Sequence, residues 1–447
     1  MPFISASAHE LKVRRIAASL ASRPPQAKLS LLKKAVSHQV PKARDLRRRD
    51  HKVDVRDLDQ ILSIDPEART CEAESGITFD ALCTETLRYG LVPIVVPELK
   101  TITIGGAVSG CSLESMSFKY GGFHDTCLSY EIISAAGEIV KCSPTLEPLV
   151  FQMMQGSFGT LGVLTKMKFK LVPAKPFVHM TYERYTTVAD YMAAIRAHAA
   201  ADDLDFMDGM VHATNNFILS CGRFVDAAPY THSYDWMRVY FRSTDTRKED
   251  YLRTKDYFFR YDRGVTNVHP KSFLARLLFG RWLDSSRLLR LADKLHFLLP
   301  HERPDITLDV FIPLNRMPEF ISWYAKEFAH FPLWCVPYGR VRDYEWLVPT
   351  FYDDMNDNML VDLAIYGMKQ TGDKHYHRLM EAKLRELGGL KTLISHNYYS
   401  HAEFWAIWNK DNYDIVKARL DPQNIFRDVY TKTCHTAMGS SAEPQAA

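Results

Sequence analysis

Three glycine-bearing segments between residues 101 and 162 constrain the fold of this chain more than any other feature. They are 101–110 (TITIGGAVSG), 119–121 (KYG) and 156–162 (GSFGTLG). Glycine has no Cβ, so the backbone N–H groups of such segments can approach a phosphate without interference from side chains. A single glycine turn is more often structural, but three in this order favour an enzyme with a phosphorylated nucleotide cofactor.

Short strands are expected around the glycine segments. Apolar runs or alternating patterns predict strands at 60–64, 70–74, 91–97, 128–134 and 139–142. A helix is expected at 78–89, with Thr78 as its cap and Gly90 as its end. No strand leads into a G-x-G-x-x-G that opens a helix, so the Rossmann fingerprint is absent.

Two motifs resemble those of the flavoproteins of the vanillyl-alcohol oxidase or p-cresol methylhydroxylase type. They are P-x-x-x-T-x-T-x-G-G-x-x-x-G, which begins at Pro97, and G-x-x-G-T-x-G-x-x-T, which begins at Gly156. The resemblance implies that these motifs hold the pyrophosphate, ribityl and isoalloxazine parts of FAD. The residues that it places at the cofactor are Pro97, Thr101, Ile102, Thr103, Gly105, Gly106, Gly110, Ser115, Tyr120, Gly121, Asp125, Gly159, Thr160 and Gly162.

The resemblance also bears on how FAD is attached. In several relatives a histidine in the first pyrophosphate loop carries FAD covalently, and Ser37 and His38 fall where that loop is expected. The usual glycines of the loop are missing here, so an ordinary loop histidine or a phosphate contact is the favoured interpretation. Noncovalent FAD and no metal are therefore expected.

Other segments resemble the Diminuto-type delta-24 sterol side-chain reductases and the bacterial reductases of 10-methylene fatty acyl lipids. These segments are 114–121, 172–176, 332–337, 398–405 and 429–432. The resemblance implies an FAD-dependent reductase of a carbon–carbon double bond in a lipid, either a methylene-branched fatty acyl chain of a phospholipid or a sterol-like side chain, with electrons from NADPH. The alternatives are an oxidase or dehydrogenase of an alcohol or alkyl substrate, and a non-catalytic flavin-binding partner of a lipid methyltransferase.

Reduction of an isolated alkene needs hydride at one carbon and a proton at the other. The C-terminal segment resembles the part of the family that returns over the isoalloxazine, which places Tyr398 there as the proton donor or as a substrate-positioning hydroxyl. His396 and Glu403 are expected behind it. The structural alternatives are that Tyr398 packs and that Glu403 simply precedes a helix.

Length, composition and pattern predict an α+β fold with two domains. The chain has 447 residues, of which 46% are hydrophobic, and this exceeds what one core usually organises. Strands are expected at 205–211, 216–222, 306–313 and 359–366, with helices at 187–200 and 317–328. The expected organisation is a basic helical arm at 1–27, an FAD-binding domain of the vanillyl-alcohol oxidase type at 28–176, a substrate domain of antiparallel sheet covered by helices at 177–404, a segment returning to the FAD domain at 405–438, and a flexible tail at 439–447.

Charge and cysteine usage indicate where such an enzyme would act. The eight cysteines form no C-x-x-C pair and no apolar run is long enough to cross a membrane, which favours a reducing, cytoplasmic setting. Basic residues crowd the first fifty positions, and they predict a solvated face, phosphate contacts or an anionic membrane surface. A lipid substrate favours a peripheral position at the inner face of the membrane. The net charge of +3 argues against nucleic acid as a partner.

Overall fold

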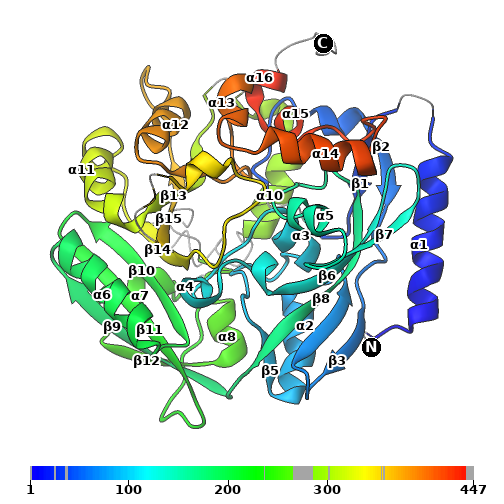
Figure 1. Ribbon diagram of the computed structural model, residues 1–447. Coiled ribbons are helices and arrows are strands. Elements are labelled where there is room, and N and C mark those ends of the chain that lie inside the picture. Colours follow the sequence, from blue (N-terminus) through cyan, green and yellow to red (C-terminus); the bar gives the residue numbers. More distant parts are fainter. Residues whose placement is uncertain are drawn as a thin grey trace.

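The computed structural model describes residues 3–24, 27–35, 39–235, 237–264, 285–300, 303–353, 355 and 358–438. Two large sheets are antiparallel throughout, and helices pack around them (Figure 1). Among the named strands of these residues, parallel pairing is confined to β1 (Leu29–Leu32) and β2 (His51–Asp54). The predicted α+β fold is therefore confirmed, whereas the domain boundaries stay predictions.

The first sheet has the order β3-β4-β8-β6-β7, and β5 also pairs with β8. Its strands are β3 (Ile61–Asp65), β4 (Thr70–Glu74), β5 (Leu91–Pro93), β6 (Cys127–Ile133), β7 (Ile139–Cys142) and β8 (Val163–Pro173). The strand expected at 91–97 ends at Pro93. Pro93 and Pro97 have no N–H to donate to a ladder, and the backbone bends between them.

The second sheet has the order β12-β9-β11-β10-β14-β15-β13-β16. Its strands are β9 (Phe177–Tyr185), β10 (Phe206–Ala213), β11 (Asn216–Val225), β12 (Glu249–Arg253), β13 (Ile306–Pro313), β14 (Leu333–Gly339), β15 (Met359–Met368) and β16 (Leu390–Lys391). The four strands predicted for this part of the chain are present as β10, β11, β13 and β15. The antiparallel order brings β13, β14 and β15 together although the chain leaves the sheet between them.

The two faces of the second sheet bury different cores, because successive side chains on a strand point to opposite faces. One face lies under α6 (Val188–Ala201), α11 (Met317–Glu327) and α12 (Tyr376–Glu386), and it presents Val310 and Leu363 to them (Figure 1). The opposite face presents Trp334, Val336 and Leu360 to a core that it shares with the first sheet. This shared face is where the two sheets meet.

The remaining helices connect the strands and close the ends of the sheets. They are α1 (Ala6–Ala21), α2 (Phe79–Thr86), α3 (Ile104–Ser109), α4 (Ser117–Tyr120), α5 (Pro148–Met153), α7 (Tyr240–Ser243), α8 (Thr254–Phe258), α10 (Ser285–Lys294), α13 (His401–Trp405), α14 (Lys410–Leu420), α15 (Val429–Thr433) and α16 (His435–Met438). Thr78 caps α2 as predicted, and Gly90 follows it with a φ of 66°. Part of the first glycine segment is not a turn but the short helix α3, which Thr103 caps.

Helix α1 packs against the first sheet through Val13, Ile16 and Leu20. Its basic side chains have acidic partners, because Lys12 Nζ lies 2.8 Å from Glu74 Oε2 and Arg15 lies 2.7 Å from Asp57. These two cations therefore serve to hold α1 on the sheet. No helix in the described part of the chain is both long and apolar enough to cross a membrane.

Candidate active site

A cavity, partly open to solvent, lies where the two sheets meet. Gly110, Gly156 and Phe158 line it from the glycine segments, and Phe311 and Tyr338 line it from the second sheet. Further apolar lining comes from Trp346, Leu347, Phe351, Leu360, Leu390, Leu393 and Trp408. An apolar space with a few polar groups is typical of a site for a flat aromatic ring or a hydrocarbon chain.

Asp125 links the two walls of this cavity. Its Oδ2 accepts hydrogen bonds from Gly122 N–H at 2.9 Å, from the Tyr344 hydroxyl at 2.9 Å and from the Tyr338 hydroxyl at 3.1 Å. Its Oδ1 accepts from Arg342 Nε at 3.0 Å. The Asp125 carboxylate, predicted to contact FAD, is thus already satisfied by the protein and positions the tyrosines of the cavity wall.

His124, next to this aspartate, lines the cavity with a neutral ring. Neither ring nitrogen of His124 has a hydrogen-bond partner among the described residues, although Nε2 lies 3.3 Å from Asp125 Oδ2. Burial lowers the pKa of His124, despite the nearby carboxylate. A neutral imidazole at a cavity wall can donate one hydrogen bond and accept another.

The glycines of the predicted cofactor site differ in what surrounds them. A Cβ at Gly105 would lie 2.8 Å from Ser75 O, and a Cβ at Gly162 would lie 2.9 Å from Ile133 O, so both positions need glycine for packing. A Cβ at Gly106 would meet only Thr103 Oγ1, at 3.2 Å, and one at Gly159 would meet only Lys432 Nζ, at 3.8 Å. Gly106 and Gly159 therefore leave open space that a ligand can occupy.

Several other residues predicted at the cofactor have their polar groups occupied within the protein. Tyr257 donates its hydroxyl hydrogen to Ser115 Oγ at 2.8 Å, and Tyr413 does the same to Thr160 Oγ1 at 2.9 Å. The segment that precedes α3 contains Pro97, Thr101, Ile102 and Thr103. Helix α4 ends at Tyr120, and Gly121 follows it. Ser37 and His38 lie outside the described residues. FAD contacts by all of these residues stay predictions.

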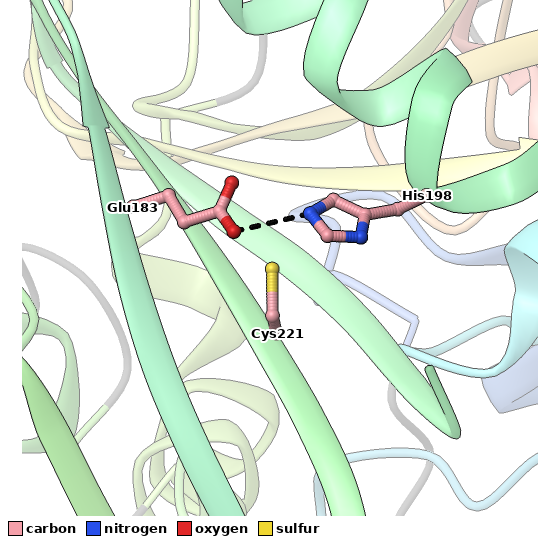
Figure 2. A group of neighbouring side chains, drawn as sticks. All are labelled: Glu183, His198 and Cys221. Atoms are coloured by element: carbon pink, nitrogen blue, oxygen red, sulfur yellow. Dashed lines mark hydrogen bonds and ion pairs between the residues drawn. The ribbon is translucent and has the colours of Figure 1, made fainter. Parts of the chain in front are cut away.

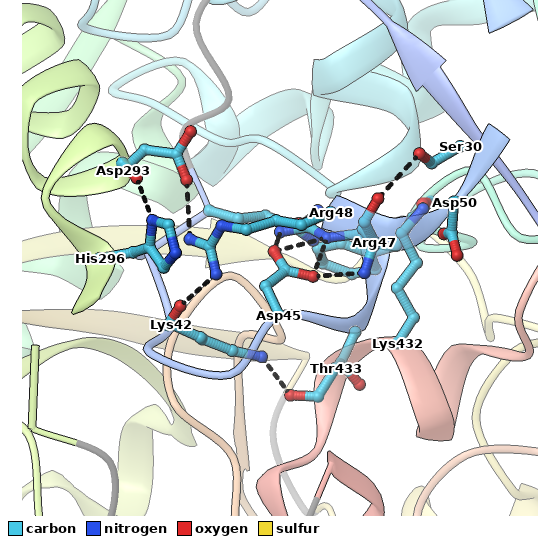
Figure 3. A network of polar contacts seen from close by, with 12 residues as sticks. Ser30, Lys42, Asp45, Arg47, Arg48, Asp50, Asp293, His296, Lys432 and Thr433 are labelled. Carbon is cyan, nitrogen blue, oxygen red and sulfur yellow. Dashed lines mark hydrogen bonds and ion pairs between the residues drawn. The ribbon is translucent and has the colours of Figure 1, made fainter. Parts of the chain in front are cut away.

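Three cations, Lys42, Arg47 and Lys432, lie near one another (Figure 3). Lys42 is buried, whereas Arg47 and Lys432 are partly buried. Lys42 comes from the segment after β1 and donates to Thr433 O at 2.5 Å. Lys432 comes from α15 and donates to Phe158 O at 2.5 Å, and Phe158 itself lines the cavity. We call Lys42, Arg47 and Lys432 the basic cluster. In the sequence, Lys42 and Arg47 belong to a basic run for which phosphate contacts are one interpretation. Only the fold brings this run together with Lys432, which is distant along the chain.

The basic cluster has more positive charge than its surroundings compensate. Burial lowers the pKa of Lys42 to about 7, and Arg47 contributes to this shift. Burial also lowers the pKa of Lys432 well below its ordinary value, and the charges of Arg47 and Lys33 lower it further. Asp45 offsets part of the charge through its ion pair with Arg47. An anion bound here would stabilise the charged form of both lysines.

The described residues fit FAD on two counts. The basic cluster offers the cations that a pyrophosphate needs, and open space at Gly159 lies beside Lys432. The cavity that begins at Gly110, Gly156 and Phe158 offers the apolar walls that an isoalloxazine ring needs. When bound there, FAD supplies hydride chemistry, and the residues of this chain orient it and exclude water.

Replacing Lys432 by methionine tests the role of the basic cluster. We expect Lys432→Met to raise the Kd for FAD about 10- to 100-fold, because a charge-assisted hydrogen bond contributes about 1.5–3 kcal/mol. The apoprotein should be no less stable, since the substitution removes a partly buried cation whose pKa is already depressed. Equilibrium titration with FAD and thermal unfolding of the apoprotein measure the two effects. Lys141→Met, on the exposed side of β7, is the matched control, and equal Kd values for the two variants would exclude Lys432 from the cofactor site.

The three predicted catalytic residues do not line the cavity. The Tyr398 ring is buried and stacks on His435, with ring centroids 4.6 Å apart. His396 Nδ1 lies 2.6 Å from His435 Nε2, and burial lowers the pKa of His396 well below its ordinary value. Glu403 completes a capping box with Ser400 at the start of α13 and has 38% of its side chain exposed. The geometry thus gives Tyr398 and Glu403 structural surroundings, and their catalytic roles stay predictions.

A fully buried ion triad joins the two sheets beside the shared core. Arg260 lies 2.8 Å from Glu114 Oε1 and 3.0 Å from Asp208 Oδ2. Glu114 precedes α4 on the side of the first sheet, and Asp208 belongs to β10 of the second sheet. The guanidinium also lies over the Tyr257 ring, 4.1 Å from its centroid. One cation thus ties carboxylates from both sides of the interface.

Glu183, His198 and Cys221 form a separate group on the helix-covered face of the second sheet (Figure 2). Their potential ligand atoms lie within 4.8 Å of one another. His198 already pairs with Glu183 at 3.1 Å and with Asp203 at 3.0 Å. Burial raises the pKa of the Cys221 thiol, which disfavours the thiolate that a metal binds. The group lies on the opposite face from the cavity and takes no part in the candidate active site.

Comparison with known proteins identifies the cofactor domain. Residues 28–143 match the family model described as an FAD binding domain. This range contains α3, Asp125, and the Lys42 and Arg47 members of the basic cluster. FAD is therefore the cofactor for which this part of the chain is built.

Similarity over most of the chain extends to reductases. A delta(24)-sterol reductase homolog of Caenorhabditis elegans is 25% identical over 414 residues, which cover 85% of this chain and 78% of that protein. The delta(24)-sterol reductase of Homo sapiens is 23% identical, with 87% and 79% covered, and that of Arabidopsis thaliana is 24% identical, with 87% and 77% covered. A D-lactate dehydrogenase of Anaerostipes hadrus is 24% identical over 349 residues, which cover 74% of this chain and 69% of that protein.

Proposed function

We propose that this chain, an FAD-dependent oxidoreductase, reduces a carbon–carbon double bond in a lipid. The substrate that we propose is a methylene-branched fatty acyl chain of a phospholipid, with a sterol-like side chain as the second candidate. Similarity to the delta(24)-sterol reductases supports the class of reaction. Electrons would come from NADPH.

The observation that carries this proposal is the apolar character of the cavity. Its walls are mostly aromatic and aliphatic side chains, and these can hold a hydrocarbon segment in dry surroundings. The few polar side chains at the cavity, including His124, Tyr338 and Lys391, suit orientation of a ring or of one polar group. An alcohol or hydroxy acid would need more hydrogen-bonding partners than such walls offer.

Turnover with two lipids tests the proposal. Purified protein with bound FAD is mixed with NADPH and either a 10-methylene phospholipid in vesicles or a sterol with a side-chain double bond, and the products are analysed by mass spectrometry. We expect one saturated lipid for each NADPH consumed, with the 10-methylene phospholipid as the better substrate. A better rate with the sterol would correct the substrate and keep the reaction. NADPH oxidation without any saturated product would contradict the proposal.

The D-lactate dehydrogenase match supports a second candidate function, the oxidation of an alcohol. In that case an added hydroxy acid or alcohol should reduce the bound FAD anaerobically. A reductase should instead keep oxidised flavin until NADPH is added. Anaerobic visible spectra after each addition therefore separate the two candidates.

We also propose that the protein works at a membrane surface, beside a lipid methyltransferase that makes the alkene. A substrate held in a bilayer requires the cavity to meet that surface. Flotation with anionic vesicles measures membrane binding. Co-purification with such a methyltransferase measures the protein partnership.

A further inference from the structure

Three carboxyl groups lie together on the shared face of the second sheet, next to the cavity. They are Glu98, on the loop after β5, Asp309 on β13 and Asp362 on β15. Asp362 pairs in register with Phe311, a cavity residue, and follows Leu360, another cavity residue, by two positions on the same face. Directly paired residues have Cβ atoms about 5 Å apart, so Asp362 lies beside Phe311, although it does not itself line the cavity.

Among the described residues, no ion pair joins the carboxyl cluster to a cation. Asp309 and Asp362 are 6% and 4% exposed, and Asp309 Oδ1 accepts a hydrogen bond from the Tyr366 hydroxyl at 2.7 Å. Asp362 Oδ1 is buried and has no hydrogen-bond partner among the described residues. Buried carboxylates without a partner are strongly unfavourable, whereas the protonated acid can be tolerated.

The charges around the cluster also favour the protonated form of its carboxyl groups. Burial raises the pKa of Asp362 well above its ordinary value, and the charges of Asp309 and Glu98 raise it further. Burial raises the pKa of Glu98 to about 8, an effect that Glu114 and Asp309 increase and that Arg260 opposes. Arg260 is already paired with Glu114 and Asp208. The other ionisable side chains near Asp362 are Tyr366 on β15 and Cys335 on β14.

We propose that Asp362, supported by Asp309 and Glu98, holds the proton that reduction of the lipid double bond requires and delivers it from the second-sheet wall of the cavity. This inference rests on the proposed function and names its acid. Asp362 does not itself line the cavity, but its register partner Phe311 belongs to the second-sheet wall of the cavity. Asp362 would thus take the role predicted for Tyr398.

The step balances as follows. The carboxyl O–H bond breaks, and its proton forms a C–H bond with one alkene carbon while the π bond opens. The other carbon receives hydride from the reduced flavin that the proposed function supplies. The lipid is thereby reduced by two electrons, the flavin is oxidised, and the carboxylate left on the cluster recovers a proton from solvent.

Two measurements on Asp362→Asn, made with FAD-loaded protein, test the inference. Infrared spectra of the oxidised protein at pH 7, without substrate, should lose a protonated-carboxyl band relative to wild type. In rapid mixing with a 10-methylene phospholipid, flavin reduced beforehand with dithionite should be reoxidised about 10²- to 10⁴-fold more slowly than in wild type. Asp226→Asn, whose side chain is 80% exposed, is the matched control and should change neither result.

The pH dependence of unfolding supplies an independent readout. The unfolded chain releases these protons near the ordinary values of 3.8 and 4.5, whereas the folded chain keeps them longer. The folded state therefore loses stability as the pH rises from about 4 towards 8, and Asp362→Asn should reduce that loss. An unchanged carboxyl band, an unchanged pH profile or an unchanged reoxidation rate in Asp362→Asn would overturn the inference. Failure of wild-type flavin to react with any lipid alkene would overturn the proposed function and this inference with it.

Discussion

Replacing Gly106 by leucine should abolish FAD binding while leaving the apoprotein folded. Among the described residues outside its own helix backbone and chain neighbours, only Thr103 Oγ1 comes within 4 Å of a Cβ built at Gly106, at 3.2 Å. A longer side chain there therefore extends into open space rather than into the core. If FAD occupies that space, the leucine side chain excludes it. Overpacking of this kind can cost about 3 kcal/mol. We expect the Kd for FAD to rise by about 100-fold or more.

The adjacent glycine provides the matched control. A Cβ at Gly105 would lie 2.8 Å from both Ser75 O and Ser75 Cβ, so Gly105→Leu should destabilise the fold itself. Flavin absorbance after gel filtration reports loss of FAD binding, and thermal unfolding of the apoprotein reports loss of fold stability. Together they separate the effects of the two substitutions. Gly106→Leu with normal flavin content would show that FAD does not lie against α3.

Of the substitutions proposed for this protein, Arg260→Met should cause the largest decrease in the free energy of unfolding. The substitution leaves Glu114 and Asp208 buried without their cation, and breaking a buried ion pair costs about 3–5 kcal/mol. Asp208 still accepts hydrogen bonds from Tyr261 at 3.0 Å and Trp334 at 2.8 Å. Urea unfolding of the FAD-loaded protein measures the change in free energy.

Arg14→Met is the matched control for this substitution. Arg14 is 74% exposed in its ion pair with Glu10, so its removal should change the free energy of unfolding by less than about 1 kcal/mol. Adding Asp208→Asn to Arg260→Met should recover part of the loss, because one uncompensated charge is removed. Equal stability of the Arg260 and Arg14 variants would show that the triad does not hold the sheets together.

Short-range patterns in the sequence were sufficient to predict most of the strands and helices of the fold. Alternation of apolar residues predicted β4, and Thr78 and Gly90 marked the helix between β4 and the glycine segments. Each of these signals acts over a few residues, so the sequence contains it in full. The strand predicted at 91–97 is too long, because the hydrogen-bond ladder between β5 and β8 ends at Pro93.

The candidate site was harder to predict because long-range pairing builds it. Phe311, Tyr338 and Leu360 belong to three strands whose register places them on one cavity wall. Lys42 and Lys432 meet only through the fold. Asp362 is the one acidic residue in the apolar run 359–365 (MLVDLAI), and that local pattern does not tell which other carboxyl groups the fold brings close to it.

One of the predicted catalytic residues has a structural role that the sequence pattern indicates. The pattern S-H-A-E at residues 400–403 is a capping box, in which the glutamate returns to the start of its own helix. Glu403 lies there, paired with Arg385 at 2.7 Å, and not at the cavity. Tyr398 gave no such signal, since a buried tyrosine and a catalytic one look alike in sequence.

A single-turnover experiment tests the central claim most directly. FAD in the purified protein is reduced with one equivalent of dithionite under anaerobic conditions, and a 10-methylene phospholipid is added without NADPH. A lipid alkene reductase should regain the spectrum of oxidised flavin and yield one saturated lipid for each flavin. A flavin that stays reduced until oxygen is admitted, with this lipid and with a sterol alkene alike, would contradict the account.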